Sequence, residues 1–418
     1  MGKYISLGEY NKNYKYILLY LVFRALNDCI YSLEYSGLYE EISFFGDNAK
    51  QFFKDHKIIN TIFSYFGIFI FSLILIKYDS YIQKNKSING NIRKTENSTE
   101  LIYNEPEDFI NENKNRIYLN IFLVAFLWVI IDLLDAIRSI DVNDFWSLKM
   151  PFVYFFGKKM FNIQVYKHQI FAIYFISIVC SLLLIISYIL FLIKHININT
   201  NYFYIIFDIL IYFFNLLIDA FSDWKAKLIM DLKFISSSKL FLCYGILGII
   251  IYSIICTITT LISCEKDNDE NDLFKFDNFV KYFDDLTKLN SILMISYVIT
   301  FALKSYFYLL TIEHLTPFHV ISMPTFYLFF IHIVLGTKLI INYKNEIKEN
   351  MVYILLEVIA CLFGLIAFSI FLEFIELNFC LCNYNLKRYI VQRSNKEIND
   401  YNNDESIISE EDKAEEDI

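Results

Sequence analysis

The sequence contains few of the residues that interrupt helices. Its 418 residues include only four prolines and eleven glycines. Proline breaks a helix interior and glycine weakens one, so this scarcity favours long helices. A closed β-barrel would need short segments in which polar and apolar residues alternate, and no such series is visible in the sequence. The sequence therefore predicts an all-α protein.

Signatures of ATP-driven pumps and of common enzymes are also missing. The sequence has no Gly-x-x-x-x-Gly-Lys loop, no His-Glu-x-x-His pair, no Gly-x-Ser-x-Gly turn and no kinase motif. We therefore expect no enzymatic activity and no cofactor. Most of the eight cysteines lie in or beside apolar runs, where we interpret them as small buried hydrophobes, and we expect no metal site.

Positive charge is in short supply. There are 37 lysines and arginines against 46 acidic residues, which gives a net charge of −9. This balance argues against nucleic acid and against anionic lipid surfaces as partners.

Apolar residues, in contrast, are abundant. They make up 56% of the chain, whereas a soluble domain has about 45–50%. Runs of about 18 or more apolar residues recur, and each is about long enough to cross a hydrocarbon layer of roughly 30 Å. The sequence thus predicts a polytopic membrane protein with about ten transmembrane helices, at residues 16–33, 58–76, 117–140, 144–161, 168–193, 202–221, 241–262, 289–311, 318–339 and 352–377. The fourth segment is the weakest and by itself resembles a re-entrant helix.

The chain is organised around residues 202–262, where two apolar runs flank a short basic connector. Asp208, Asp219 and Asp223 fall on one stripe of the first run, since a helix turns by about 100° per residue. Such a stripe faces a polar bundle interior. Gly245 and Gly248 lie three residues apart in the second run and would let a neighbouring helix come close.

The same stretch resembles the drug/metabolite transporter superfamily, in particular its solute carrier 35 F branch. Residues 225–230 are similar to the charged turn that ends one helix there, and residues 243–248, CYGILG, are similar to the E-G-x-x-G motif that opens the next. Tyr244 stands where the motif has its glutamate.

Further matches lie on both sides of this stretch. DFWSLKMPFVYFF, the Lys158-Lys159 pair and residues 167–169, KHQ, are similar to the superfamily's S-x-x-Q-M-L-R/K-G segment and the basic residues that follow it. The turn at 313–317, EHLTP, is similar to K/E-H-L-S/T-P, and the segment that contains Gly364 and ends in FLEFIEL is similar to the closing helix. The resemblance implies a secondary transporter for a small polar organic metabolite, of which nucleotide sugars are one class.

Ten segments divide into five before residue 200 and five after it, and an odd number per half gives the halves opposite orientations. We therefore expect an N-terminus at 1–15, a first half at 16–200 with a disordered polar linker at 77–116, a second half at 201–378 and an acidic tail at 379–418. Lysines and arginines are concentrated in the even-numbered connectors, which predicts that both termini are cytoplasmic. The membrane is either the plasma membrane or an endomembrane.

Ionisable side chains at bilayer depth are costly and so are candidates for function. We expect the substrate-binding residues to be Lys304, Lys149, Asp208, Asp135 and Arg24. A lysine there would contact an anionic substrate or relay charge, and an aspartate would couple protons or hold a cation. The alternative for each is a structural ion pair, such as Lys304 with Asp208 or Arg24 with Asp28, and for Lys304 also a side chain that extends toward the cytoplasmic face. Asp219 and Asp223 are interpreted as a gate or a helix cap near the membrane edge.

The expected partners are a small-molecule substrate and the lipid bilayer, while the oligomeric state stays open, a homodimer included. The alternative function is a membrane receptor or scaffold without transport activity, which the tyrosine at position 244 would suit.

Overall fold

In the computed structural model, the part of the chain that can be described comprises residues 7–31, 52–53, 56–90, 114–137, 148–161, 165, 167–183, 185–186, 202–231, 235–261, 279–321 and 344–371. Every regular element in these ranges is helical, and they contain no strand. The all-α prediction is confirmed for this part of the chain.

Four of the described helices contain stretches long and apolar enough to cross a membrane. They are α3 (Lys57–Gly90), α5 (Lys114–Ile137), α10 (Ser237–Leu261) and α12 (Lys288–His314). This set is compatible with a membrane protein. The other helices are α1 (Leu7–Tyr31), α6 (Lys149–Phe161), α7 (Lys167–Phe175) with its π-helical continuation η2 (Ile176–Cys180), α9 (Tyr202–Asp231), α11 (Phe279–Asp284) and α14 (Lys344–Phe371).

Nine of the ten apolar segments predicted from the sequence overlap one of these helices, whereas the count of ten spans stays a prediction. The ninth segment, 318–339, is described only at its start, where residues 317–321 are helical. The predicted acidic tail at 379–418 and the predicted side-chain role of Asp208 lie outside the described residues.

Two helices are longer than the apolar runs that predict them. The polar linker expected from residue 77 begins as helix, because α3 continues to Gly90. No proline and no glycine interrupts residues 77–89, and the helix ends at Gly90, a residue that commonly ends helices. The disorder predicted for 77–90 is therefore wrong.

The basic connector at 222–240 is also largely helical, since α9 continues to Asp231. Ala226, Ile229 and Met230 are buried in the core there. Their spacing of three and four residues places them on one face of a helix, so packing extends the helix beyond the apolar run.

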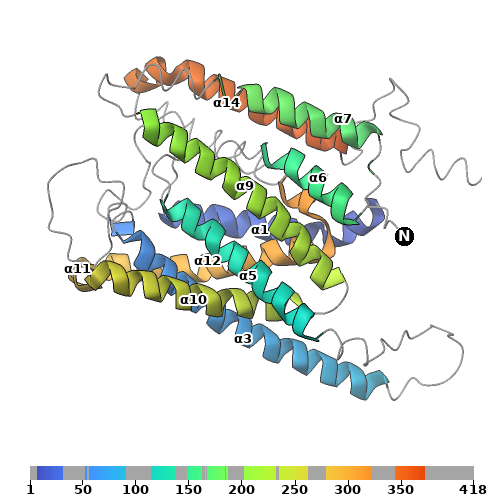
Figure 1. The fold of residues 1–418 in the computed structure, drawn as a ribbon, viewed down its shortest axis with the longest axis vertical. Helices are drawn as coiled ribbons and strands as arrows, with labels where there is room; N and C mark the ends of the chain where they lie inside the picture. The colour runs from blue at the N-terminus through green and yellow to red at the C-terminus, as the bar shows by residue number, and fades with distance from the viewer. Residues whose placement is uncertain are drawn as a thin grey trace, which may run out of the picture.

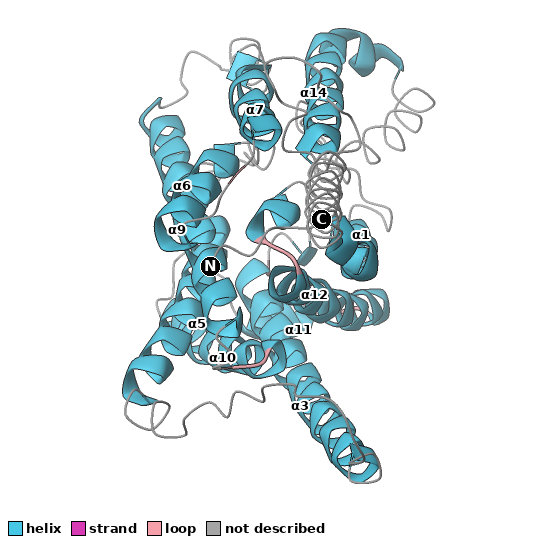
Figure 2. Cartoon of the chain, turned by 90° about the vertical axis from the view of Figure 1, so that its right-hand side faces the viewer, coloured by secondary structure: helices cyan, strands magenta, loops and turns pink. Residues whose placement is uncertain are grey.

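The long helices pack as pairs. α1 lies along α12, α3 along α10 and α5 along α9, while α7 and η2 lie along α14. Figure 1 places α7 and α14 together at one end of the molecule and α3 with α10 at the other. Figure 2, the view turned by 90°, keeps α7 and α14 together at the opposite end from α3. The middle is occupied by α1, α5, α6, α9 and α12.

Glycines allow the closest of these approaches. A Cβ atom at Gly245 on α10 would lie 3.1 Å from the backbone nitrogen of Phe69 on α3. A Cβ atom at Gly248 would lie 2.1 Å from Cδ1 of the Tyr65 ring. The predicted close approach of a neighbouring helix to this glycine pair is therefore observed, and the neighbour is α3.

Candidate functional site

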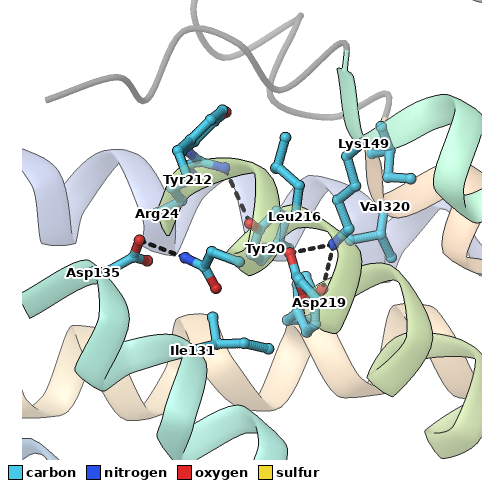
Figure 3. A pocket seen from close by; sticks show the side chains of 12 residues that line it. Tyr20, Arg24, Ile131, Asp135, Lys149, Tyr212, Leu216, Asp219 and Val320 are labelled. Atoms are coloured by element: carbon cyan, nitrogen blue, oxygen red, sulfur yellow. Dashed lines mark hydrogen bonds and ion pairs between the residues drawn. The ribbon is translucent and has the colours of Figure 1, made fainter. Parts of the chain in front are cut away.

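A cavity of about 190 Å³ lies among the central helices. Its lining residues come from α1, α5, α6, α9 and α12 and from residues 320–321 at the start of the ninth predicted segment. Arg24, Asp135 and Lys149, three of the five residues predicted from the sequence to bind substrate, line this cavity (Figure 3).

Lys149, the first residue of α6, binds two carboxylates of α9. Its Nζ atom donates to Oδ2 of Asp219 at 2.5 Å and to Oδ2 of Asp223 at 2.8 Å. The hydroxyl of Tyr308 on α12 donates to Oδ1 of Asp223 at 2.8 Å and lies 3.5 Å from the lysine Nζ. We call these four residues the Lys149 cluster. It connects three helices.

Two of the four residues in the Lys149 cluster, Lys149 and Asp223, are buried. The side chains of Lys149 and Asp223 are 9% and 0% exposed, whereas that of Asp219 is 26% exposed and lines the cavity. Desolvating charges is expensive, and close pairing with additional hydrogen bonds offsets that cost. With one ammonium group and two carboxylates, the ionised cluster carries an excess negative charge.

Local sequence explains this geometry. Asp219 and Asp223 are four residues apart in α9 and so project from the same face. The neighbouring Trp224 is buried against α6, where its Nε1 donates to the carbonyl oxygen of Val153 at 2.8 Å. This contact holds α6 against α9 and keeps Lys149 within reach of both acids.

The opposite side of the cavity carries one charge of each sign. Arg24 on α1 is half-buried and donates from Nη1 to the hydroxyl of Tyr20 at 3.2 Å. Asp135 on α5 is exposed and accepts from Nδ2 of Asn215 on α9 at 2.7 Å. Each group therefore reaches the cavity with its orientation fixed by a neighbour.

Lys304 occupies a different place. It is not among the residues that line this cavity. Its Nζ donates to Oδ1 of Asn27 on α1 at 3.3 Å, and it interacts electrostatically with Asp132 on α5. The proposed contact with substrate stays a prediction, as does its pairing with Asp208.

Asp132 is the centre of a second polar group. Its Oδ2 accepts hydrogen bonds from the hydroxyls of Tyr65 on α3, at 2.5 Å, and of Tyr244 on α10. Tyr244 stands at the position where the E-G-x-x-G motif has a glutamate. In this chain a carboxylate of α5 meets the tyrosine at that point of the helix bundle.

Sequence reasoning missed the partners of Lys149. The sequence suggests a gate or a helix cap for Asp219 and Asp223, and it gives no reason to select Tyr308. The spacing of the two acids does indicate a partner. Two acids four residues apart on the inner stripe of a helix require a cation from another helix. Only the packing of α6 on α9 identifies that cation as Lys149.

The described residues give no group of three His, Cys, Asp or Glu side chains arranged to hold a metal ion. His319, which is buried, has its Nδ1 within 2.8 Å of the Thr316 hydroxyl. No protein-family model matches this sequence, and no curated protein is detectably similar to it.

Proposed function

We propose that this protein is a secondary transporter that moves a small polar organic metabolite across a membrane by alternating access. The observation that carries the proposal is the charged cavity among the central helices. Ionisable side chains are costly at bilayer depth and normally mark a substrate or ion pathway. Arg24, Asp135, Lys149 and Asp219 all line this one cavity.

The packing of the helices supports ten spans built as two inverted repeats. In such a plan α1 corresponds to α9, α3 to α10, α5 to α12, and α7 with η2 to α14. Exchanging the halves turns the α1–α12 contact into α9–α5 and the α3–α12 contact into α10–α5, and both members of each pair are present. The α3–α10 and α7–α14 contacts map onto themselves.

The lining of the cavity follows the same exchange. α1 and α9 both contribute, as do α5 and α12, and α6 corresponds to the ninth segment, which contributes Val320 and Ile321. A cavity lined by corresponding elements of both halves lies at the repeat interface, where inverted-repeat transporters bind substrate. Rocking of one half against the other would then open it to either side in turn.

The resemblance to the drug/metabolite transporter superfamily agrees with this proposal but does not carry it. Within the proposal, the protein is an integral membrane protein of the plasma membrane or an endomembrane, with both termini in the cytoplasm. Its partners are the solute and the lipid bilayer.

The test is uptake by purified protein in proteoliposomes, measured across a panel of radiolabelled polar metabolites. We expect time-dependent accumulation of at least one solute, and we expect Asp135→Asn to reduce it at least tenfold. Asp79→Asn is the matched control, because Asp79 accepts from Ser238 at 2.6 Å and does not line the cavity. A protein that reconstitutes correctly but accumulates nothing would instead be the receptor or scaffold considered from the sequence.

A further inference from the structure

We infer that the solute carries an ammonium group, as a cation or a zwitterion, and that purely anionic metabolites are rejected. This inference rests on the proposed transport function and concerns the same cavity. It follows from three features of the cavity: its charges, its aromatic rings and the position of Lys149.

The charges around the cavity are unbalanced. Asp135 and Asp219 line it, and Asp223, which is not part of the lining, lies one turn further along the same face of α9. Among the described residues of this region, two cations, Arg24 and Lys149, stand against these three carboxylates when all of them are ionised. In a site of low dielectric an uncompensated negative charge is costly, and an entering cation relieves that cost.

Lys149 does not alter this balance in favour of anions. Its ammonium group lies 2.5 Å from Asp219 and 2.8 Å from Asp223, so its hydrogen-bonding directions and its charge are directed at those carboxylates. An anionic solute that displaced them would leave Asp223, which is fully buried, without its counter-ion. The cation contact expected for an anionic substrate is thus reversed: the lysine holds the acids in place.

The aromatic residues of the cavity favour the same class of solute. Tyr20, Tyr212 and Tyr308 contribute to its lining, and the rings of Tyr20 and Tyr308 are 5.7 Å apart between centroids. The faces of aromatic rings attract cations, and ammonium ligands are commonly held by several such rings beside a carboxylate. At about 190 Å³ the cavity is smaller than the pockets of about 300 Å³ or more that hold drug-sized ligands, so the amine is small.

The experiment compares solutes that differ in charge on a common skeleton. Proteoliposomes that contain the full chain would be supplied with radiolabelled tyramine, tyrosine or 4-hydroxyphenylpropionate, together with choline and putrescine as further cations and lactate and phosphoenolpyruvate as further anions. We expect uptake of at least one ammonium-bearing solute to exceed uptake of every anion at least tenfold.

Two variants connect that preference to the cavity. Tyr212→Leu should raise the KM for the ammonium solute several-fold, because it removes one ring from the lining. Tyr118→Leu is its control, since Tyr118 is exposed on α5 and does not line the cavity. A KM that responds equally to both substitutions would refute the assignment to this cavity.

The remaining outcomes separate the inference from the proposed function. Uptake of anions in preference to amines would overturn the inference and leave the transporter proposal intact. Absence of uptake in all three charge classes, from liposomes that contain folded protein, would count against transport itself and would remove the basis of the inference.

Discussion

At the scale of single residues, the Lys149 cluster shows how charged side chains in the described part of the chain offset the cost of their burial. One ammonium group donates hydrogen bonds to two carboxylates, and a tyrosine hydroxyl donates a further hydrogen bond to the more buried carboxylate. Removing one partner of such a buried group is far more costly than the net contribution of the intact group to stability, because a charge is left without compensation.

This asymmetry gives the first prediction. Lys149→Met leaves Asp219 and Asp223 facing each other without a cation, and it should lower the free energy of unfolding by about 3–5 kcal/mol. The measurement is thermal unfolding of purified protein in detergent. Lys158→Met, at an exposed position of the same helix, should unfold like the wild type.

A second substitution tests the cause of that loss. Adding Asp223→Asn to Lys149→Met removes the stranded charge and should recover much of the stability. Two results would show that the ion cluster does not hold α6 to α9. One is a wild-type melting temperature for Lys149→Met, and the other is a double variant that is no more stable than the single variant.

Lys304 gives a prediction with a different readout. It bonds Asn27 of α1 and interacts with Asp132 of α5. Lys304→Met should therefore destabilise the protein by about 1.5–3 kcal/mol, the usual contribution of a hydrogen bond to a charged group. A double-mutant cycle with Asp132→Asn would measure the coupling between the two charges. If the variant instead keeps its melting temperature and shows a raised KM for uptake, Lys304 contacts the substrate as the sequence suggests.

The sequence identifies the right kind of residue better than the right partners. Arg24, Asp135 and Lys149 stand out because charge is rare inside apolar segments, and all three reach the cavity. Partners depend on which helices are neighbours, and an isolated apolar segment carries no such information. The Asp219 and Asp223 pair illustrates this: its spacing is legible in the sequence, whereas Lys149 lies about 70 residues away.

At the scale of elements, the contact between α3 and α10 depends on small residues. Gly245 admits the backbone of α3, and Gly248 admits the ring of Tyr65, whose hydroxyl in turn reaches Asp132. Helices in a bilayer gain little from apolar burial, so close van der Waals contact of this kind contributes a large share of their association.

The prediction for this contact is that Gly248→Leu separates α10 from α3 and displaces Tyr65 from Asp132. Even a Cβ atom at this position would come within 2.1 Å of the tyrosine ring. We expect a marked fall in melting temperature. Ile246→Leu, at an exposed position two residues earlier in α10, is the control and should change little. Wild-type stability of the glycine variant would mean that the ring moves aside without cost.

Helix positions are also better predicted than helix ends. The apolar runs locate the helices because burial in lipid or protein requires them, but nothing in hydropathy marks where a helix continues into polar sequence. α9 continues through the basic connector because Ala226, Ile229 and Met230 find a packing surface there. That surface belongs to the tertiary structure, so the local sequence does not reveal it.

At the scale of the whole molecule, the proposed exchange of halves relates helix contacts whose sequences show no clear similarity. Under the proposed inverted repeat, helices such as α1 and α9 would correspond, and they carry different charges: Arg24 on one, Asp219 and Asp223 on the other. In such a proposal the two halves would share a backbone arrangement, while the side chains that line the cavity between them differ.

The same plan fixes a prediction about topology. With the proposed ten spans, an even number, both termini would lie on one side of the membrane. The lysines and arginines of the even-numbered connectors predict that this side is the cytoplasm. The connector that follows α3 then faces the cytoplasm, and its Asn97-Ser98-Thr99 sequon is never presented to the glycosylation machinery. In intact cells, epitope tags at both termini should resist added protease, and treatment with a glycosidase should leave the mobility of the protein unchanged.

The positive control is a sequon introduced after Leu261, at the C-terminal end of α10. In this plan that end faces the lumen or the exterior, so the introduced sequon should be glycosylated. Cleavage of one tag alone would require an odd number of spans and would end the two-fold exchange of halves. A glycan on Asn97 would show that the bundle has the opposite orientation in the membrane.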